Sequence, residues 1–217
     1  MASLKRGEGV LAAPTGAIWI GLIGYIVTTG IGFAAVAAAT WTQSTHSVDV
    51  WLHSMANPGL DWIADRLAAI DETAVVTVIL LFGGLLITFW RGWLPAIGFM
   101  AIAGVGWLLI AAVKAVVSEP RPAQMFTDTH QSLQSYPSGH VTFVMALTVA
   151  AGAALAGSRW RWPVVIVLSL LTLATAWSRL YFGVHYPMDV VGGILGGLSG
   201  AFLVLGVWNL FMRRLKL

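Results

Sequence analysis

The sequence predicts an all-α integral membrane protein, a bundle of six transmembrane helices forming a single domain over residues 1–217. Two observations support this fold class. First, 58% of the residues are hydrophobic, only 10% are charged, and the mean hydropathy is +0.83, which lies outside the range of soluble globular domains. Second, the apolar residues are gathered into six long segments, and most of the charged residues lie between them.

A helix needs roughly 20 apolar residues to cross a hydrocarbon core about 30 Å thick. Six segments reach or approach this length: Ala17 to Ala39, Ala74 to Trp90, Leu94 to Val117, Gly139 to Gly157, Pro163 to Trp177 and Met188 to Phe211. The second and fifth are short for a span, so we expect their helices to extend into the flanking residues. The first is too long for a secretory signal peptide and is interpreted as a retained span.

A loop from Thr40 to Thr73 separates the first two spans. Its apolar residues follow a helical spacing on both sides of a turn at Asn57-Pro58-Gly59, at Val50, Trp51 and Met55 and then at Trp62, Ile63, Leu67 and Ile70. This pattern predicts two short amphipathic helices that lie at the membrane interface.

The basic residues indicate the orientation in a plasma (inner) membrane. If six spans follow a cytoplasmic N-terminus, eight of the twelve basic residues lie on the cytoplasmic side: Lys5, Arg6, Arg91, Arg159, Arg161, Arg213, Arg214 and Lys216. This asymmetry is typical of the positive-inside rule and predicts that both termini are cytoplasmic. All five histidines then fall on the extracytoplasmic side, so we expect the chemistry there.

The composition also excludes some classes of function. The basic residues stand singly or in pairs at the ends of apolar runs, so nucleic acid is not a predicted partner despite the formal charge of +3. The absence of cysteine excludes disulfides, thiolate catalysis and cysteine metal sites. The lipid bilayer is the predicted environment, and the oligomeric state is left open.

Three polar clusters fall at this extracytoplasmic face. They are Lys114 to Pro122 (KAVVSEPRP), Tyr136 to His140 (YPSGH) and Trp177 to Val190 (WSRLYFGVHYPMDV). Ionisable side chains beside a membrane span are energetically costly, so a functional role is their default interpretation.

The third cluster predicts a reactive histidine. His185 and Asp189 are four residues apart, and Pro187 favours the first turn of a helix there, so the carboxylate can reach one imidazole nitrogen. A carboxylate in that place holds one tautomer and leaves the other ring nitrogen free to act as a nucleophile or base.

The other residues of the clusters predict a site for a phosphate group. Ser138 is placed as an N-cap, and Gly139 lets an anion approach the first amides of the helix that follows. Three cationic side chains and a second histidine complete the set. Cations of this kind stabilise a phosphate dianion, and two imidazoles on opposite sides of phosphorus supply a nucleophile and a proton for the leaving oxygen. These residues are Lys114, Arg121, Arg179 and His140.

At these residues the chain resembles the type 2 phosphatidic acid phosphatase family of membrane lipid phosphatases, whose signature is K-x6-R-P, P-S-G-H and S-R-x5-H-x3-D. All three parts match, and the matching residues are Lys114, Arg121 and Pro122, then Pro137, Ser138, Gly139 and His140, then Ser178, Arg179, His185 and Asp189.

The resemblance implies a phosphohistidine mechanism without metal or other cofactor. His185 would attack phosphorus, Asp189 would orient it, and His140 would protonate the leaving oxygen and later activate water. Lys114, Arg121, Ser138, Gly139 and Arg179 would bind the phosphate. The substrates implied are lipid phosphates, with undecaprenyl diphosphate as the first choice and phosphatidylglycerol phosphate or phosphatidic acid as alternatives.

Other interpretations of the same residues remain. One is a metal site made by His130, His140, His185 and Asp189, although no ligand pair has the spacing typical of a metal site and the arginines would repel a cation. Others are the soluble vanadate-dependent haloperoxidases, which share the signature, and a non-enzymatic lipid carrier or scramblase.

Several residues also have a purely structural interpretation. Glu119 is expected to be a solvated loop residue, Ser178 either a packing residue or a phosphate contact, and the glycines of the last span a surface for close helix packing or, less favoured, for dimerisation. These glycines are Gly192, Gly193, Gly196, Gly197 and Gly200.

Overall fold

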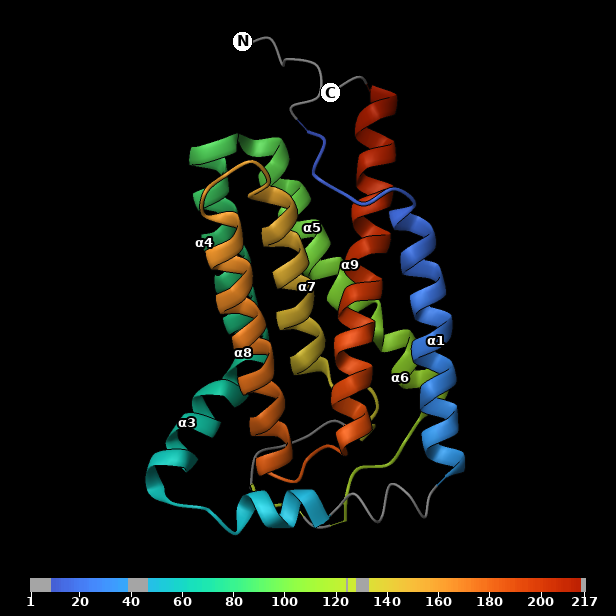
Figure 1. The fold of residues 1–217 in the computed structure, drawn as a ribbon, viewed down its shortest axis with the longest axis vertical. Helices are drawn as coiled ribbons and strands as arrows, with labels where there is room; N and C mark the ends of the chain where they lie inside the picture. Colours follow the sequence, from blue (N-terminus) through green and yellow to red (C-terminus); the bar gives the residue numbers. More distant parts are fainter. Residues whose placement is uncertain (1–8, 39–46, 124, 128–132, 216–217) are drawn as a thin grey trace.

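The computed structural model describes residues 9–38, 47–123, 125–127 and 133–215, and its regular structure is helical apart from one isolated bridge between Pro120 and Gln134. Long helices lie side by side in a bundle (Figure 1). Their bounds are α1 (Ala17–Ala37), α4 (Thr73–Arg91), α5 (Trp93–Leu108) continued by α6 (Ile110–Val117), α7 (Gly139–Ala154), α8 (Arg161–Tyr181) and α9 (Pro187–Leu215). The predicted all-α class is confirmed.

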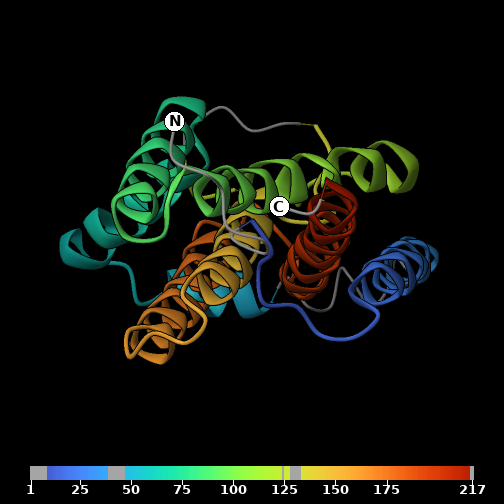
Figure 2. The ribbon, with the colours of Figure 1, turned by 90° about the horizontal axis from the view of Figure 1, so that it is seen from above.

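Five of these segments are long and apolar enough to cross a membrane: α1, α4, α5 with α6, α8 and α9. The remaining one, α7, has only 16 residues, which correspond to about 24 Å of helix. It is the core of the bundle, because 13 of its residues are buried and it packs against α5, α8 and α9 (Figure 2). The count of six spans therefore stays a prediction.

The helices follow the predicted apolar segments within a few residues at each end. The short second and fifth segments do extend into their flanks, to 19 and 21 residues in α4 and α8. The third segment, expected as one helix from Leu94 to Val117, is instead broken at Leu109 into α5 and α6. Gly104 and Gly106 precede the break, and glycine is a poor helix former.

The glycines of α9 pack inside the chain. A Cβ on Gly200 would lie 2.1 Å from the carbonyl oxygen of Gly106 in α5, and one on Gly197 would lie 2.6 Å from the carbonyl oxygen of Thr142 in α7. A side chain at either position would push the helices apart. The packing interpretation of this glycine series is confirmed.

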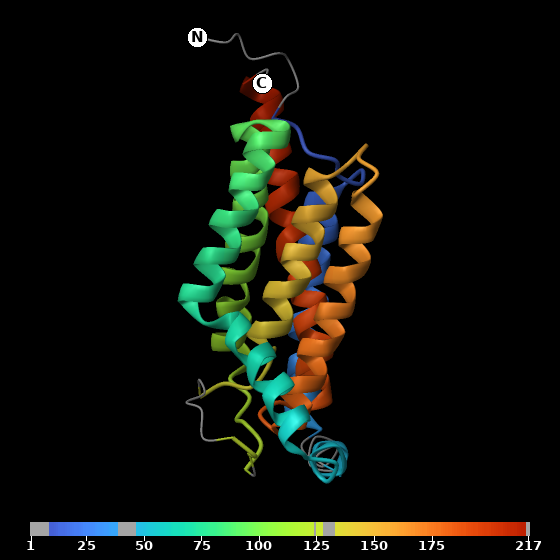
Figure 3. The same cartoon turned by 90° about the vertical axis from the view of Figure 1, so that its left-hand side faces the viewer.

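The first loop contains both predicted helices. Residues 47–53 are helical, and α3 (Pro58–Ala68) continues into the 3-10 turn η1 (Ala69–Asp71). Asn57 caps α3, since its side-chain oxygen accepts hydrogen bonds from the amides of Gly59 and Leu60 at 3.1 Å each. Both helices lie at one end of the bundle (Figure 3). Their place at a membrane interface stays a prediction.

The polar clusters and the two described chain ends lie at opposite ends of the bundle (Figure 1). At one end the Asn209 side chain exchanges hydrogen bonds with the backbone of Leu11 at 2.7 and 2.9 Å, and the Trp208 indole donates to the Gly9 carbonyl at 2.8 Å. At the other end lie the loops that follow α6, precede α7 and join α8 to α9. The three clusters therefore face one another, as their sequence positions predict.

Candidate active site

The turn between α8 and α9 brings His185 against Asp189. Gly183 adopts φ +61°, a left-handed conformation that favours glycine and is common just after a helix. The chain then reverses, and Pro187 begins α9 as predicted. Nδ1 of His185 lies 3.0 Å from Oδ2 of Asp189, one helical turn away. The same oxygen accepts the amide of Tyr186 at 2.9 Å and the hydroxyl of Ser135.

His185 is neutral in this setting. Its side chain is 1% exposed, and burial lowers its pKa to about 4, although the Asp189 carboxylate partly opposes that shift. Because Asp189 accepts the proton on Nδ1, the other nitrogen, Nε2, keeps its lone pair. Nε2 lies 3.3 Å from a guanidinium nitrogen of Arg121, so its lone pair accepts a hydrogen bond from that cation.

Arg121 and Lys114 hold the loops around His185 together. Arg121 donates to the carbonyl of Val184 at 2.5 Å. The ammonium of Lys114 donates to the carbonyls of Gln134 and Ser135 at 3.1 and 3.3 Å. Both cations of the first cluster therefore lie beside the histidine of the third.

His140 lies in the first turn of α7 with the second arginine. Its Nε2 is 2.8 Å from the carbonyl oxygen of Ala68, at the junction of α3 and η1, and 3.3 Å from a guanidinium nitrogen of Arg179. A carbonyl can only accept, so Nε2 of His140 carries a hydrogen. Arg179 is 1% exposed and also donates to the hydroxyl of Ser178 at 3.0 and 3.2 Å.

The start of α7 offers donors for an anion. Ser138 occupies the predicted N-cap position, but its side chain makes no capping hydrogen bond. Its buried hydroxyl has no partner among the described residues. Its amide donates to the carbonyl of Asp189 at 3.0 Å, which ties α7 to α9. The first amides of a helix, here beginning at Gly139, have no acceptor within the helix and favour anions.

Three residues of the site were not predicted. Ser135 donates to Asp189 and lies 3.3 Å from Nδ1 of His185, and Ala68 binds His140 through its backbone. Glu119 is the third. It was expected to be a solvated loop residue, and that prediction is wrong. It is 3% exposed, because the loop before α7 covers it, with the Ser135 amide donating to the Glu119 carbonyl at 2.7 Å.

The structure thus gathers the predicted residues into two histidine–arginine pairs, His185 with Arg121 and His140 with Arg179, near the start of α7. Within the described part of the chain, groups of His, Asp and Glu arranged to hold a metal ion are not found. His130, which belonged to the alternative metal site, lies outside the described residues.

The fold and this arrangement define a helical membrane protein of the phosphatase type. The PAP2 superfamily profile matches residues 92–213, so the chain belongs to the PAP2 superfamily, and it is a multi-pass membrane protein.

Individual relatives refine the comparison. The chain is 36% identical over 98 residues to an undecaprenyl-diphosphatase of Sulfolobus acidocaldarius, covering 42% of this chain and 44% of the relative. It is 25% identical over 183 residues to phosphatidylglycerophosphatase B of Bacillus subtilis, covering 80% and 90%. The chain spans about half the length of the undecaprenyl-diphosphatases that it matches.

A crystal structure of a transmembrane PAP2-type phosphatidylglycerolphosphate phosphatase from Bacillus subtilis has the same fold. Its TM-score is 0.72 at 19% identity, over 90% of this chain and 97% of that one.

Proposed function

We propose that this protein is a lipid phosphate phosphatase that hydrolyses a terminal phosphate through a phosphohistidine intermediate, at the extracytoplasmic face of a six-span plasma membrane protein. The observation that carries the proposal is the neutral His185, held by Asp189 at 3.0 Å, with Nε2 turned toward Arg121. A structural histidine does not need an unprotonated nitrogen that faces a cation, whereas a nucleophile that attacks a bound phosphate does.

In the first step, Nε2 of His185 attacks phosphorus and a P–N bond forms as the P–O bond to the lipid breaks. The imidazole becomes cationic, and Asp189 stabilises that charge. Arg121, Arg179, Lys114, the Ser138 hydroxyl and the amides from Gly139 onward bind the phosphoryl oxygens. The proposed general acid is the cationic form of His140, which a bound phosphate dianion favours. It gives the proton on Nε2 to the leaving oxygen, which takes the place of the Ala68 carbonyl as hydrogen-bond acceptor, and His140 is left as a neutral imidazole.

In the second step, water attacks the phosphohistidine. His140, now lacking that proton, takes one from the attacking water, and the P–N bond breaks to release inorganic phosphate and neutral His185. The enzyme returns to its starting protonation state, and no metal takes part in either step.

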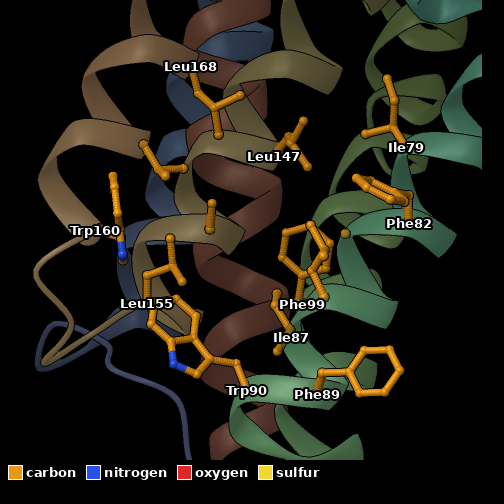
Figure 4. Close-up of a pocket in the computed structure, with 14 residues that line it drawn as sticks. Ile79, Phe82, Ile87, Phe89, Trp90, Phe99, Leu147, Leu155, Trp160 and Leu168 are labelled. Atoms are coloured by element: carbon orange, nitrogen blue, oxygen red, sulfur yellow. The ribbon is translucent and has the colours of Figure 1, made fainter.

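For the substrate we propose undecaprenyl diphosphate, hydrolysed to undecaprenyl phosphate, ahead of phosphatidylglycerol phosphate and phosphatidic acid. Two observations support this choice. Several relatives are named undecaprenyl-diphosphatase. A cavity of about 730 Å³ between α4 and α8, with α5 and α7 behind it, is lined almost entirely by apolar side chains (Figure 4).

The depth of this cavity favours a long tail. Leu168 and Val164 line it, and they lie 11 and 15 residues before Arg179 in α8, or about 16 and 22 Å along the helix. One leaflet of the hydrocarbon core is about 15 Å thick. Leu147, seven residues after His140 in α7, also lines the cavity and lies only about 10 Å along the helix. The cavity therefore extends from the half of the bilayer nearer the site into the other half, and a polyprenyl chain is long enough to occupy its full length.

The test is phosphate release by the purified full chain in detergent, with undecaprenyl diphosphate, phosphatidylglycerol phosphate and phosphatidic acid compared by kcat/KM. We expect release with a chelator present, a phosphoenzyme trapped by acid quench, and the highest kcat/KM for undecaprenyl diphosphate. Failure to release phosphate from any of the three would refute the activity, and a preference for phosphatidic acid would refute the substrate.

A further inference from the structure

The feature that the mechanism above leaves unused is the buried carboxyl group of Glu119. It lies in the loop after α6, between Lys114 and Arg121 in sequence, and is 3% exposed. A carboxylate buried this deeply without a partner is strongly unfavourable. The position therefore needs either a cation bound to Glu119 or a proton on it.

The surroundings of Glu119 favour the proton. Asp189 is an acidic group close enough for its negative charge to raise the pKa of the Glu119 carboxyl. Oε2 of Glu119 and Oδ1 of Asp189 are both buried, and among the described residues neither oxygen has a hydrogen-bond donor. Two buried carboxyl groups that interact, each with an oxygen that lacks a donor, are both satisfied when one of them carries a hydrogen and donates it to the other.

The proton resides on Glu119 rather than on Asp189. Oδ2 of Asp189 already accepts hydrogen bonds from Ser135, His185 and the Tyr186 amide, and each of these favours the ionised form of Asp189. Burial and the neighbouring Asp189 charge raise the pKa of Glu119 to about 8.

We infer that Glu119 is the positioning residue of the catalytic pair, a protonated carboxylic acid that donates a hydrogen bond to Oδ1 of Asp189 and so holds Asp189 against His185. This inference rests on the proposed function only where it is tested by enzyme kinetics. Oδ2 of Asp189 orients His185, and the bond from Glu119 fixes the second oxygen, which prevents the carboxylate from rotating away. The reaction consumes no proton from Glu119.

Loss of this proton has a defined effect. Above pH 8 two carboxylates would face each other in a buried site, and their repulsion would move Asp189 away from His185. Tyr136 and Tyr186 face the same cluster, but burial raises the pKa of each, so they ionise at still higher pH. Among the described residues, charged groups that also act on the cluster include Lys114, Arg121, His185 and Asp49.

Substitution of Glu119 by glutamine distinguishes a role in positioning Asp189 from a role in packing alone. Glu119→Gln keeps a donor of the same shape but cannot ionise, so we expect kcat near wild type at pH 7 and persistence of activity at pH 9, where the wild type has lost most of it. Glu119→Ala should lower kcat on the order of 10- to 100-fold at pH 7, since it removes a hydrogen bond to a charged group. The matched control is Glu72→Gln, an exposed glutamate before α4, with an unchanged profile.

Two outcomes would overturn the inference: an alkaline loss of activity in Glu119→Gln equal to that of the wild type, or an inactive Glu119→Gln that is folded. A readout independent of catalysis is the infrared carbonyl band of a protonated carboxylic acid in the wild-type chain. We expect this band at pH 6 and its loss by pH 10, and a wild-type spectrum without it at pH 6 would contradict the proposal. This measurement holds even if no lipid tested is a substrate, so the two proposals fail separately.

Discussion

Replacement of Asp189 by asparagine tests the central pair most directly. The variant Asp189→Asn keeps the size of the side chain but removes its charge, while the imidazole of His185 still becomes cationic when it is phosphorylated. Nδ1 and Oδ2 are 3.0 Å apart in the wild type, so the centres of charge lie at roughly 4 Å. At an effective dielectric constant of about 20, that separation corresponds to about 4 kcal/mol. At about 1.4 kcal/mol per factor of ten, we expect kcat to fall on the order of 10³-fold.

The assay is steady-state phosphate release, with kcat and KM determined separately. KM should change little, because the groups proposed to bind phosphate remain in Asp189→Asn. The control is Asp65→Asn on α3, which removes an exposed carboxylate, and both variants must elute as folded protein in detergent. A kcat within tenfold of wild type for Asp189→Asn would refute the charge argument.

Other predictions follow from the same geometry. His185→Ala should abolish both turnover and the acid-trapped phosphoenzyme, while His140→Ala should slow formation and hydrolysis of the intermediate; a normal burst in either variant, measured by rapid quench, contradicts its assigned role. Because burial lowers the pKa of His185 to about 4, the neutral nucleophile persists in acid, so kcat/KM should reach half its maximum near pH 4 to 5; a midpoint at 6.5 would show an unperturbed histidine. Leu168→Trp should fill the apolar cavity and lower kcat/KM about tenfold for undecaprenyl diphosphate but not for farnesyl diphosphate. Leu170→Trp, at a lipid-facing position 60% exposed, should change neither, and equal effects of the two variants would contradict the tail site.

Residues whose partners are close in sequence were the most predictable. The four-residue spacing of His185 and Asp189 and the proline at the first turn of α9 are sufficient to bring the two side chains together, because helix geometry determines which side chains are neighbours. The apolar segments likewise predicted the positions of the long helices.

Contacts between distant segments were less predictable. The hydrogen on Nε2 of His140 is determined by the Ala68 carbonyl, 72 positions away in the chain. Glu119 was placed in solvent because it lies in the first cluster without being a position of the family signature. Only the loop before α7, folded over it, makes that position buried.

The sequence by itself determined a helical membrane protein and predicted the residues proposed for its site, since apolar length and motif spacing are local properties of the chain. Only the tertiary structure decided the partners of the groups in the site. Ser135 and Glu119 lie beside Asp189, and the carbonyl of Ala68 accepts a hydrogen bond from His140. The physical reason is that burial removes water as an alternative partner, and in its absence the protonation state of each group depends on neighbours brought in from elsewhere in the chain.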